Sequence, residues 1–227
     1  MKHSGIIVIV LFYLVFSGTL KAQSFYRFKA DYTLKLHDKT GKPTMKMGTV
    51  FYDKNFKKLV VKNGFPVKEL VVSIDTATYF IRVGRVIKKI TNLSPVEFSI
   101  FHLALNGDLN NFGLEQAGYV LEDAVQDKGL VITSWLPKNN FNDKLGKVLI
   151  ATKNKNLYSI VFLDTRENTI AKHIFHRYMN YKGFVFPTEI VRIYYHDKKE
   201  SYEVTTYRNI KVNESGNEEY YNYKIPE

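Results

Sequence analysis

The stretch YRFKADYTLKLH, residues 26–37, alternates apolar and polar side chains without a break. A strict period of two is typical of a β-strand with one buried face and one hydrated face. The segment DKTGKP at 38–43 predicts a turn, after which the alternation resumes at 45–51. Residues 26–51 are therefore expected to form a long antiparallel hairpin.

Much of the remaining sequence repeats this pattern. The connections are short and rich in Asn, Asp, Gly and Lys, which favours antiparallel neighbours. About eleven strands in sequence order predict a meandering sheet, which strand twist curls toward a barrel. Beyond the first hairpin we expect strands at 58–62, 68–74, 78–90, 129–136, 147–152, 157–163, 172–181, 189–195, 202–212 and 220–225, with a return to strand at 119–121.

The segment 94–107 has the signals of a helix instead. Ser94 is placed to cap the first turn, Pro95 suits the first helical position, and Glu97 completes a capping box. Gly107 stands where a left-handed residue ends a helix. The segment has one apolar stripe of Phe98, Phe101 and Leu105, and a second of Ile100, Leu103 and Ala104. A helix apolar nearly all round must be covered on several sides, so we expect it inside or across the mouth of a curved sheet. A weaker helical turn is expected at 114–118.

The N-terminal segment has the layout of a targeting signal. A basic start at 1–3 precedes an apolar run at 5–16 and a small-residue region at 17–22, which predicts a secretory signal peptide cleaved after Ala22. A membrane-spanning helix needs about 20 apolar residues, and Ser17, Thr19 and Lys21 interrupt this run. We therefore expect residues 1–22 to be a signal peptide and 23–227 to form one exported, periplasmic domain that does not span the membrane.

Composition removes several kinds of chemistry. The chain has no Cys, which excludes a disulfide-stapled fold, a thiol nucleophile, a thiolate zinc site and a lipid-modified N-terminal cysteine. The formal net charge of +11 favours weak attraction to anionic membrane surfaces. Nucleic acid is not an expected partner, because Lys and Arg are dispersed and no recognition motif is present.

Catalytic and metal-binding motifs are missing from the sequence. It contains no Gly-rich phosphate loop, no G-x-S-x-G elbow and no H-E-x-x-H pattern. His173 and His176 form a close pair, but on the predicted strand their odd spacing puts one ring inward and the other outward. We expect no enzyme activity, no cofactor and no metal. A hydrolase is the weakest alternative, since no Ser/His/acid arrangement is evident.

Several predicted strands are apolar on both faces. In 157–163 and 190–195, neighbouring positions on opposite faces are both apolar. A sheet with two dry faces needs a cover on each, from the helix, loops, a partner or a ligand. Ordinary packing would satisfy this requirement, and so would an apolar cavity of the kind that a partly closed sheet offers.

The C-terminal half resembles a known family. The stretch MNYKGFVFPTEI at 179–190 precedes TYRNIKVN at 206–213 and a closing YYNYKIP at 220–226. These segments are similar to the LolA-like family of periplasmic lipoprotein carriers and outer-membrane lipoprotein-sorting proteins. The resemblance implies an unclosed antiparallel β-barrel of about eleven strands, with helices plugging a cavity for acyl chains. Carriers of this type place an Arg early in the second or third strand to hold the lid; residues 53–58 here have Lys and no Arg.

These observations lead to a functional hypothesis. We expect a monomeric carrier or chaperone that holds the acyl chain of a lipid or acylated protein, exchanged with membrane-associated donor and acceptor proteins. The alternative is a non-enzymatic envelope interaction or sensor module on the same fold. The helix predicted at 94–107 is expected to act as a lid over the cavity, through Phe98, Phe101 and Leu105. The cavity is expected to be lined by Tyr26, Phe28, Tyr32, Leu34, Phe51, Phe80, Trp135, Ile160, Phe162 and Ile190.

Overall fold

A single antiparallel sheet of thirteen strands dominates the structure, which is a computed structural model describing residues 24–38, 40–92, 94–138, 145–196 and 199–226. The predicted signal peptide, 1–22, lies outside these residues. The strands are β1 (Arg27–His37), β2 (Pro43–Asp53), β3 (Lys58–Phe65), β4 (Glu69–Ile74), β5 (Ala77–Arg82), β6 (Arg85–Thr91), β7 (Tyr119–Asp127), β8 (Leu130–Pro137), β9 (Val148–Lys153), β10 (Asn156–Leu163), β11 (Thr169–Tyr181), β12 (Phe184–His196) and β13 (Lys199–Val212).

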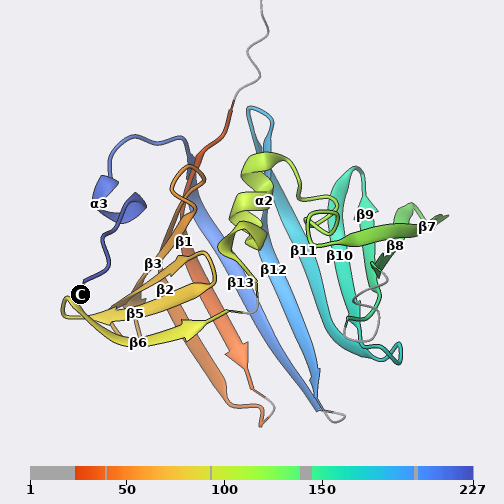
Figure 1. Cartoon of the computed structure of the whole chain (residues 1–227), viewed down its shortest axis with the longest axis horizontal. Helices are drawn as coiled ribbons and strands as arrows, with labels where there is room; N and C mark the ends of the chain where they lie inside the picture. Colours follow the sequence, from red (N-terminus) through yellow and green to blue (C-terminus); the bar gives the residue numbers. More distant parts are fainter. Residues whose placement is uncertain (1–23, 39, 93, 139–144, 197–198, 227) are drawn as a thin grey trace, which may run out of the picture.

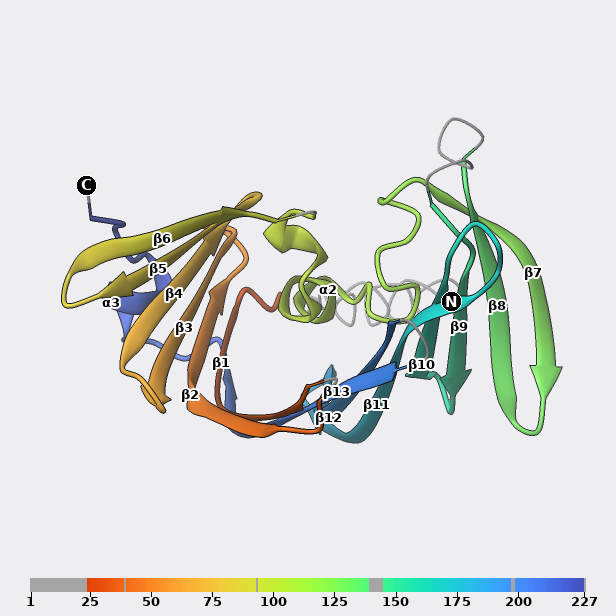
Figure 2. The ribbon, with the colours of Figure 1, turned by 90° about the horizontal axis from the view of Figure 1, so that it is seen from below.

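The strand order explains why the sheet stays open. It runs β6-β5-β4-β3-β2-β1-β13-β12-β11-β10-β9-β8-β7, so the first and last strands pair in the middle and consecutive strands β6 and β7 form the two edges. The connection between these edges, residues 92–118, must cross the mouth of the curved sheet. It does so as a 3₁₀ turn, η1 (Val96–Phe98), followed by the short helix α2 (Ile100–Asn106). Figure 2 shows α2 in the hollow of the sheet, between the rims that carry β6 and β7.

The sheet has a core on each face. The inner core joins α2 to strands from both halves, and includes Phe28, Phe101, Trp135, Ile160 and Ile190. A smaller core lies on the outer face of the β2–β5 wall, where Phe51, Val60, Val72 and Ile81 are covered by Tyr221. Tyr221 belongs to α3 (Glu218–Tyr221), a single turn in the C-terminal segment that lies outside this wall (Figure 1). This outer core covers β2 to β5, so it does not cover β10 and β12, the strands that contain the predicted two-sided apolar segments 157–163 and 190–195.

Three sequence predictions about elements are corrected. The expected strand at 78–90 is a hairpin, β5 and β6, with a turn at Val83 and Gly84, both of which have positive φ. The expected strand at 220–225 is α3 followed by coil, because its aromatic residues pack across the outer face and not within the sheet. Residues 114–118 form hydrogen-bonded turns and no helix. With the nine-residue β7, these changes bring the sheet to thirteen strands.

The helix begins five residues later than predicted. Pro95 and Ser99 have extended ψ values of 158° and 147°, so η1 and α2 are separate pieces. The N–H of Val96 donates to the carbonyl of Asp75, and no side chain caps η1, so the predicted capping box of Ser94 and Glu97 does not form. Ser99 caps α2 instead, its side chain accepting from the N–H of His102. The predicted left-handed end at Gly107 is confirmed, with φ of 81°.

Candidate functional site

Phe101 plugs the hollow of the sheet. Its ring lies 5.1 Å from that of Phe28, 6.0 Å from Phe186 and 5.8 Å from Tyr207, measured between centroids. The side chain comes from the buried face of α2 and is 6% exposed. Aromatic contacts at these separations are favourable beyond simple burial. One ring from the connection between the two edge strands therefore packs against side chains of β1, β12 and β13.

A cavity of about 280 Å³ adjoins this ring. Its walls are the inner faces of β1 to β5 on one side and Phe101 with β13 on the other. Most of the lining is apolar, as a site for an apolar ligand requires. The lining residues are Tyr32, Leu34, Lys46, Val50, Val61, Asn63, Val71, Phe80, Phe101, Thr205 and Tyr207.

The polar groups of the cavity are held by one another. The Tyr32 hydroxyl donates to Oδ1 of the buried Asn63, whose Nδ2 donates to Glu69 at 3.2 Å. Glu69 in turn accepts from Arg82 at 3.1 Å. Burial raises the pKa of Tyr32 to about 12, so its phenol stays neutral. Lys46, which is exposed, is the only charged residue of the lining.

Two polar contacts fasten η1 and α2 to β2 and the turn that follows it. The Tyr52 hydroxyl lies 2.6 Å from Nδ1 of His102 on α2. Burial lowers the pKa of His102 and raises that of Tyr52, so the hydrogen bond joins a neutral phenol and a neutral imidazole. Lys57 lies 3.2 Å from Glu97 of η1, with both side chains partly exposed. A lysine from the segment 53–58 therefore contacts the lid, where the family resemblance would place an arginine.

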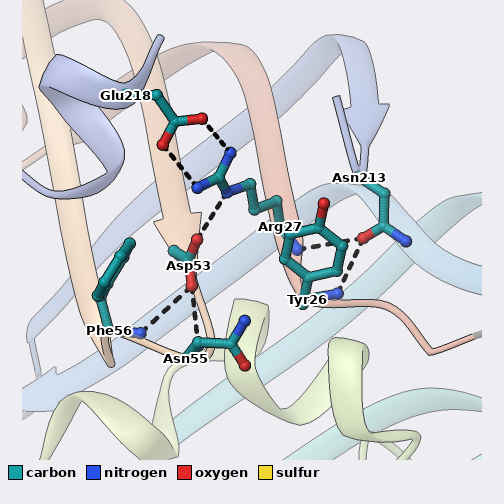
Figure 3. A network of polar contacts seen from close by, with 7 residues as sticks. All are labelled: Tyr26, Arg27, Asp53, Asn55, Phe56, Asn213 and Glu218. Carbon is teal, nitrogen blue, oxygen red and sulfur yellow. Dashed lines mark hydrogen bonds and ion pairs between the residues drawn. The ribbon is translucent and has the colours of Figure 1, made fainter. Parts of the chain in front are cut away.

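The strongest polar network lies outside the hollow and centres on Arg27 (Figure 3). Its Nε donates to Asp53 at 2.6 Å, and its Nη atoms donate to both oxygens of Glu218 at 2.6 and 2.7 Å. Asp53 is 1% exposed and also accepts from the N–H groups of Asn55 and Phe56. Arg27 thus joins β1, the β2–β3 turn and α3. Sequence reasoning missed this network, because Arg27 occupied an ordinary outward position of the first strand.

The structure separates the predicted lining residues into four groups. Tyr32, Leu34 and Phe80 come together at the cavity with Phe101. Phe28, Trp135, Ile160, Ile190 and the lid residue Leu105 are buried in the inner core, with Phe162 packed against it. Phe51 lies on the opposite face under α3, because β2 directs Val50 and Tyr52 inward. Tyr26 precedes β1 and its ring lies 5.6 Å from the Arg27 guanidinium, while Phe98 is half-buried outside both cores.

The histidine pair lies on β11 as its spacing predicts. His173 points inward, where its ring lies 5.1 Å from Phe162, and burial lowers its pKa to about 3. His176 points outward, 6.4 Å from the ring of Tyr158. Within the described ranges, no three His, Asp or Glu side chains gather as a metal site would need. The same residues include no helix long and apolar enough to cross a membrane.

Comparison with known proteins identifies the fold. No protein-family model matches the chain, and no curated protein matches its sequence. A LolA superfamily protein from Nitrosomonas europaea is similar in structure, with a TM-score of 0.57, 12% identity, and coverage of 87% of this chain and 91% of that one. A DUF1329 family protein from Desulfovibrio piger is similar with a TM-score of 0.59 and 15% identity, over 88% of this chain and 91% of that one. A domain from Vibrio parahaemolyticus, described as a putative outer membrane lipoprotein-sorting protein domain, is similar with a TM-score of 0.58 and 11% identity, over 86% of this chain and 89% of that one.

Proposed function

From the LolA-like fold that this chain shares with those solved structures, we propose that it is a non-catalytic carrier that binds an acyl chain. The observation that carries the proposal is the apolar cavity between Phe101 and the inner faces of β1 to β5. The load would be a lipid or an acylated protein. In this proposal residues 1–22 direct export, and the domain exchanges its load in the periplasm with membrane-associated donor and acceptor proteins.

The size of the cavity sets the scale of binding. A volume of about 280 Å³ corresponds to roughly nine groups of the size of a water molecule, at about 30 Å³ each. Burial of one CH₂ contributes about 0.8 kcal/mol, so a chain that filled the space would gain about 7 kcal/mol before the cost of association. The ammonium of Lys46 is suited to an anionic headgroup at the exposed side of the cavity.

The lid supplies a route for loading and release. Phe101 stands beside the cavity, so rotation or withdrawal of α2 would enlarge the space by the volume of its ring. The Tyr52–His102 and Lys57–Glu97 contacts hold α2 in the closed position. The Lys57–Glu97 pair is partly exposed and contributes about 1 kcal/mol or less, while the hydrogen bond of the buried Tyr52 contributes about 1–2 kcal/mol. Such a closed state can yield to a bound chain.

A pair of matched variants tests the proposal. Leu34 and Lys35 are neighbours on β1 that point to opposite faces, the first into the cavity and the second outward. Leu34→Trp should fill the cavity, whereas Lys35→Trp adds the same ring to the outside. Native mass spectrometry of the purified proteins should detect co-purified lipid with the natural sequence and Lys35→Trp, and little with Leu34→Trp. Equal lipid content in all three, or none in any, would reject the proposal.

A second candidate function rests on the edge strand β7. Its residues are almost all exposed, and Leu121 and Val125 are 53% and 50% exposed. An unpaired edge with apolar side chains can accept a strand from another protein. An envelope interaction module would use this edge, and Val125→Lys would then abolish partner capture while lipid content stayed unchanged.

A further inference from the structure

The outer face of the sheet has a cavity of its own, of about 740 Å³. Its floor includes Phe51, Leu70 and Ile81 from β2, β4 and β5. The C-terminal segment forms a wall through Tyr220 and Tyr223. Figure 2 shows this segment on the side of the β1–β6 wall opposite to α2. Successive side chains of a strand point to opposite faces, so the sheet lies between this outer cavity and the acyl-chain cavity, and Asn63 is the one described residue that lines both.

Lysines give the outer cavity its electrostatic character. Lys29, Lys62 and Lys68 line it, together with the carboxylates of Asp31 and Glu69. Both carboxylates already have donors. Asp31 accepts from Thr49 and Asn209 at 3.0 and 2.8 Å, and Glu69 pairs with Arg82 at 3.1 Å. Lys29 also pairs with Glu214 at 3.4 Å. Three lysines against two carboxylates give the lining a formal excess of one positive charge, which an acidic group can complement.

An aromatic pair stands between two of these lysines. The rings of Phe51 and Tyr220 are stacked, with centroids 4.7 Å apart and an interplanar angle of 16°. The Lys29 ammonium lies 5.6 Å from the Phe51 ring. That of Lys62 lies 4.6 Å from the Tyr220 ring and donates to the Tyr220 hydroxyl at 2.6 Å. Both ammonium groups are thus held at the flanks of one apolar platform. This arrangement offers an apolar body a surface to pack on and its acid group two nearby cations.

We infer that the outer cavity is a second binding site, for a small anionic amphiphile with an apolar or aromatic body and one acid group. Its volume lies in the range of about 300–1,000 Å³ that is usual for small-molecule sites. An apolar floor with a few charged groups at its side is the composition such a ligand requires. Among the described residues, the site shares only Asn63 with the lining of the acyl-chain cavity and includes no residue of α2, so it can be tested separately from the carrier function.

Two fluorescent probes with the same aromatic body test this assignment. 8-Anilinonaphthalene-1-sulfonate has a sulfonate, and N-phenyl-1-naphthylamine is its uncharged counterpart. The double variant Lys29→Gln, Lys62→Gln should weaken sulfonate binding by about tenfold, the equivalent of about 1.4 kcal/mol, and change the affinity for the neutral probe by less than about twofold. Leu34→Trp, which fills the inner cavity, should leave the sulfonate affinity of the outer site unchanged.

The control removes the same charge elsewhere. Lys89 and Lys182 also lie over tyrosine rings, at 5.3 Å from Tyr79 and 5.4 Å from Tyr181, but do not line the cavity. The double variant Lys89→Gln, Lys182→Gln should bind the sulfonate as the natural sequence does. The inference is overturned if both double variants lose equal affinity, if only Leu34→Trp loses it, or if the natural sequence does not bind the sulfonate. Circular dichroism confirms that each variant is folded before binding is compared.

Discussion

Removing the Phe101 ring should lower the stability of the protein and raise its affinity for an acyl chain. Phe101→Ala deletes a side chain that is 6% exposed and packs against the rings of Phe28, Phe186 and Tyr207. Substitutions of this kind typically cost about 3–5 kcal/mol of stability. The ring also stands at the wall of the 280 Å³ cavity, so its loss would extend that cavity.

The size of each effect follows from the volume of the ring. Phe exceeds Ala by about 100 Å³, which at about 24 cal/mol per Å³ of cavity accounts for about 2.4 kcal/mol of the lost stability. The same space admits about three more CH₂ groups of a ligand, at about 0.8 kcal/mol each. We therefore expect affinity for dodecanoate to rise by about tenfold or more, while the free energy of unfolding falls by about 3–4 kcal/mol.

Urea unfolding and calorimetric titration with dodecanoate measure the two quantities. Phe175→Ala provides the control, because Phe175 is 3% exposed in the same core but does not line the cavity. It should lose comparable stability and leave dodecanoate binding unchanged. A fall in affinity with Phe101→Ala would show that the ring forms part of the binding surface and does not compete for it, which would refute the displacement argument.

Three further predictions concern the contacts around the site. Tyr52→Phe removes the hydroxyl that hydrogen-bonds to His102, so amide exchange across 100–106 should accelerate and stability should fall by about 1–2 kcal/mol. Lys57→Gln, which breaks the more exposed ion pair with Glu97, should lower stability by less than about 0.5 kcal/mol. The pKa of His173 falls to about 3 on folding, chiefly by burial and then through Arg192, so only the unfolded chain gains a proton as the pH drops below about 6.5. Between pH 7.5 and 5 this group should cost about 2 kcal/mol of stability, a slope that His173→Phe should remove in urea titrations at both pH values. Arg27→Met leaves the buried Asp53 without its cation and should cost about 3–5 kcal/mol, whereas Glu218→Gln at the exposed end of the network should cost about 1 kcal/mol or less in the same unfolding assay.

The face of the sheet on which a residue lies was predictable only where apolar and polar residues alternate strictly. In β1 the period of two correctly places Phe28, Tyr32 and Leu34 on the inner face. In β2 three consecutive residues, Val50 to Tyr52, are all apolar, so the pattern cannot say which of them faces inward, and Phe51 was assigned to the wrong face. One register step separates the two outcomes.

Long-range covers were not predictable from local patterns. The aromatic segment at 220–225 satisfies the pattern of a strand, yet it packs across the outside of the sheet, held by Arg27 through Glu218. Similarly, the signals at 94–97 are those of a helix start, but the Val96 N–H bonds to the carbonyl of Asp75 and the helix is capped at Ser99 instead. In both places a partner distant in sequence decides the local structure.

The modest size of the inner cavity favours exchange over storage. An acyl chain filling it would gain about 7 kcal/mol from burial. Association costs at least about 4 kcal/mol of translational and rotational freedom. If the ring of Phe101 must also move out, its burial is worth a further 1.5–3 kcal/mol, roughly, to the closed state. The net free energy of loading therefore lies near zero, so neither the loaded nor the empty state is strongly favoured. A carrier that collects a chain at one membrane and surrenders it at another requires this balance, whereas a much larger unplugged cavity would retain its load.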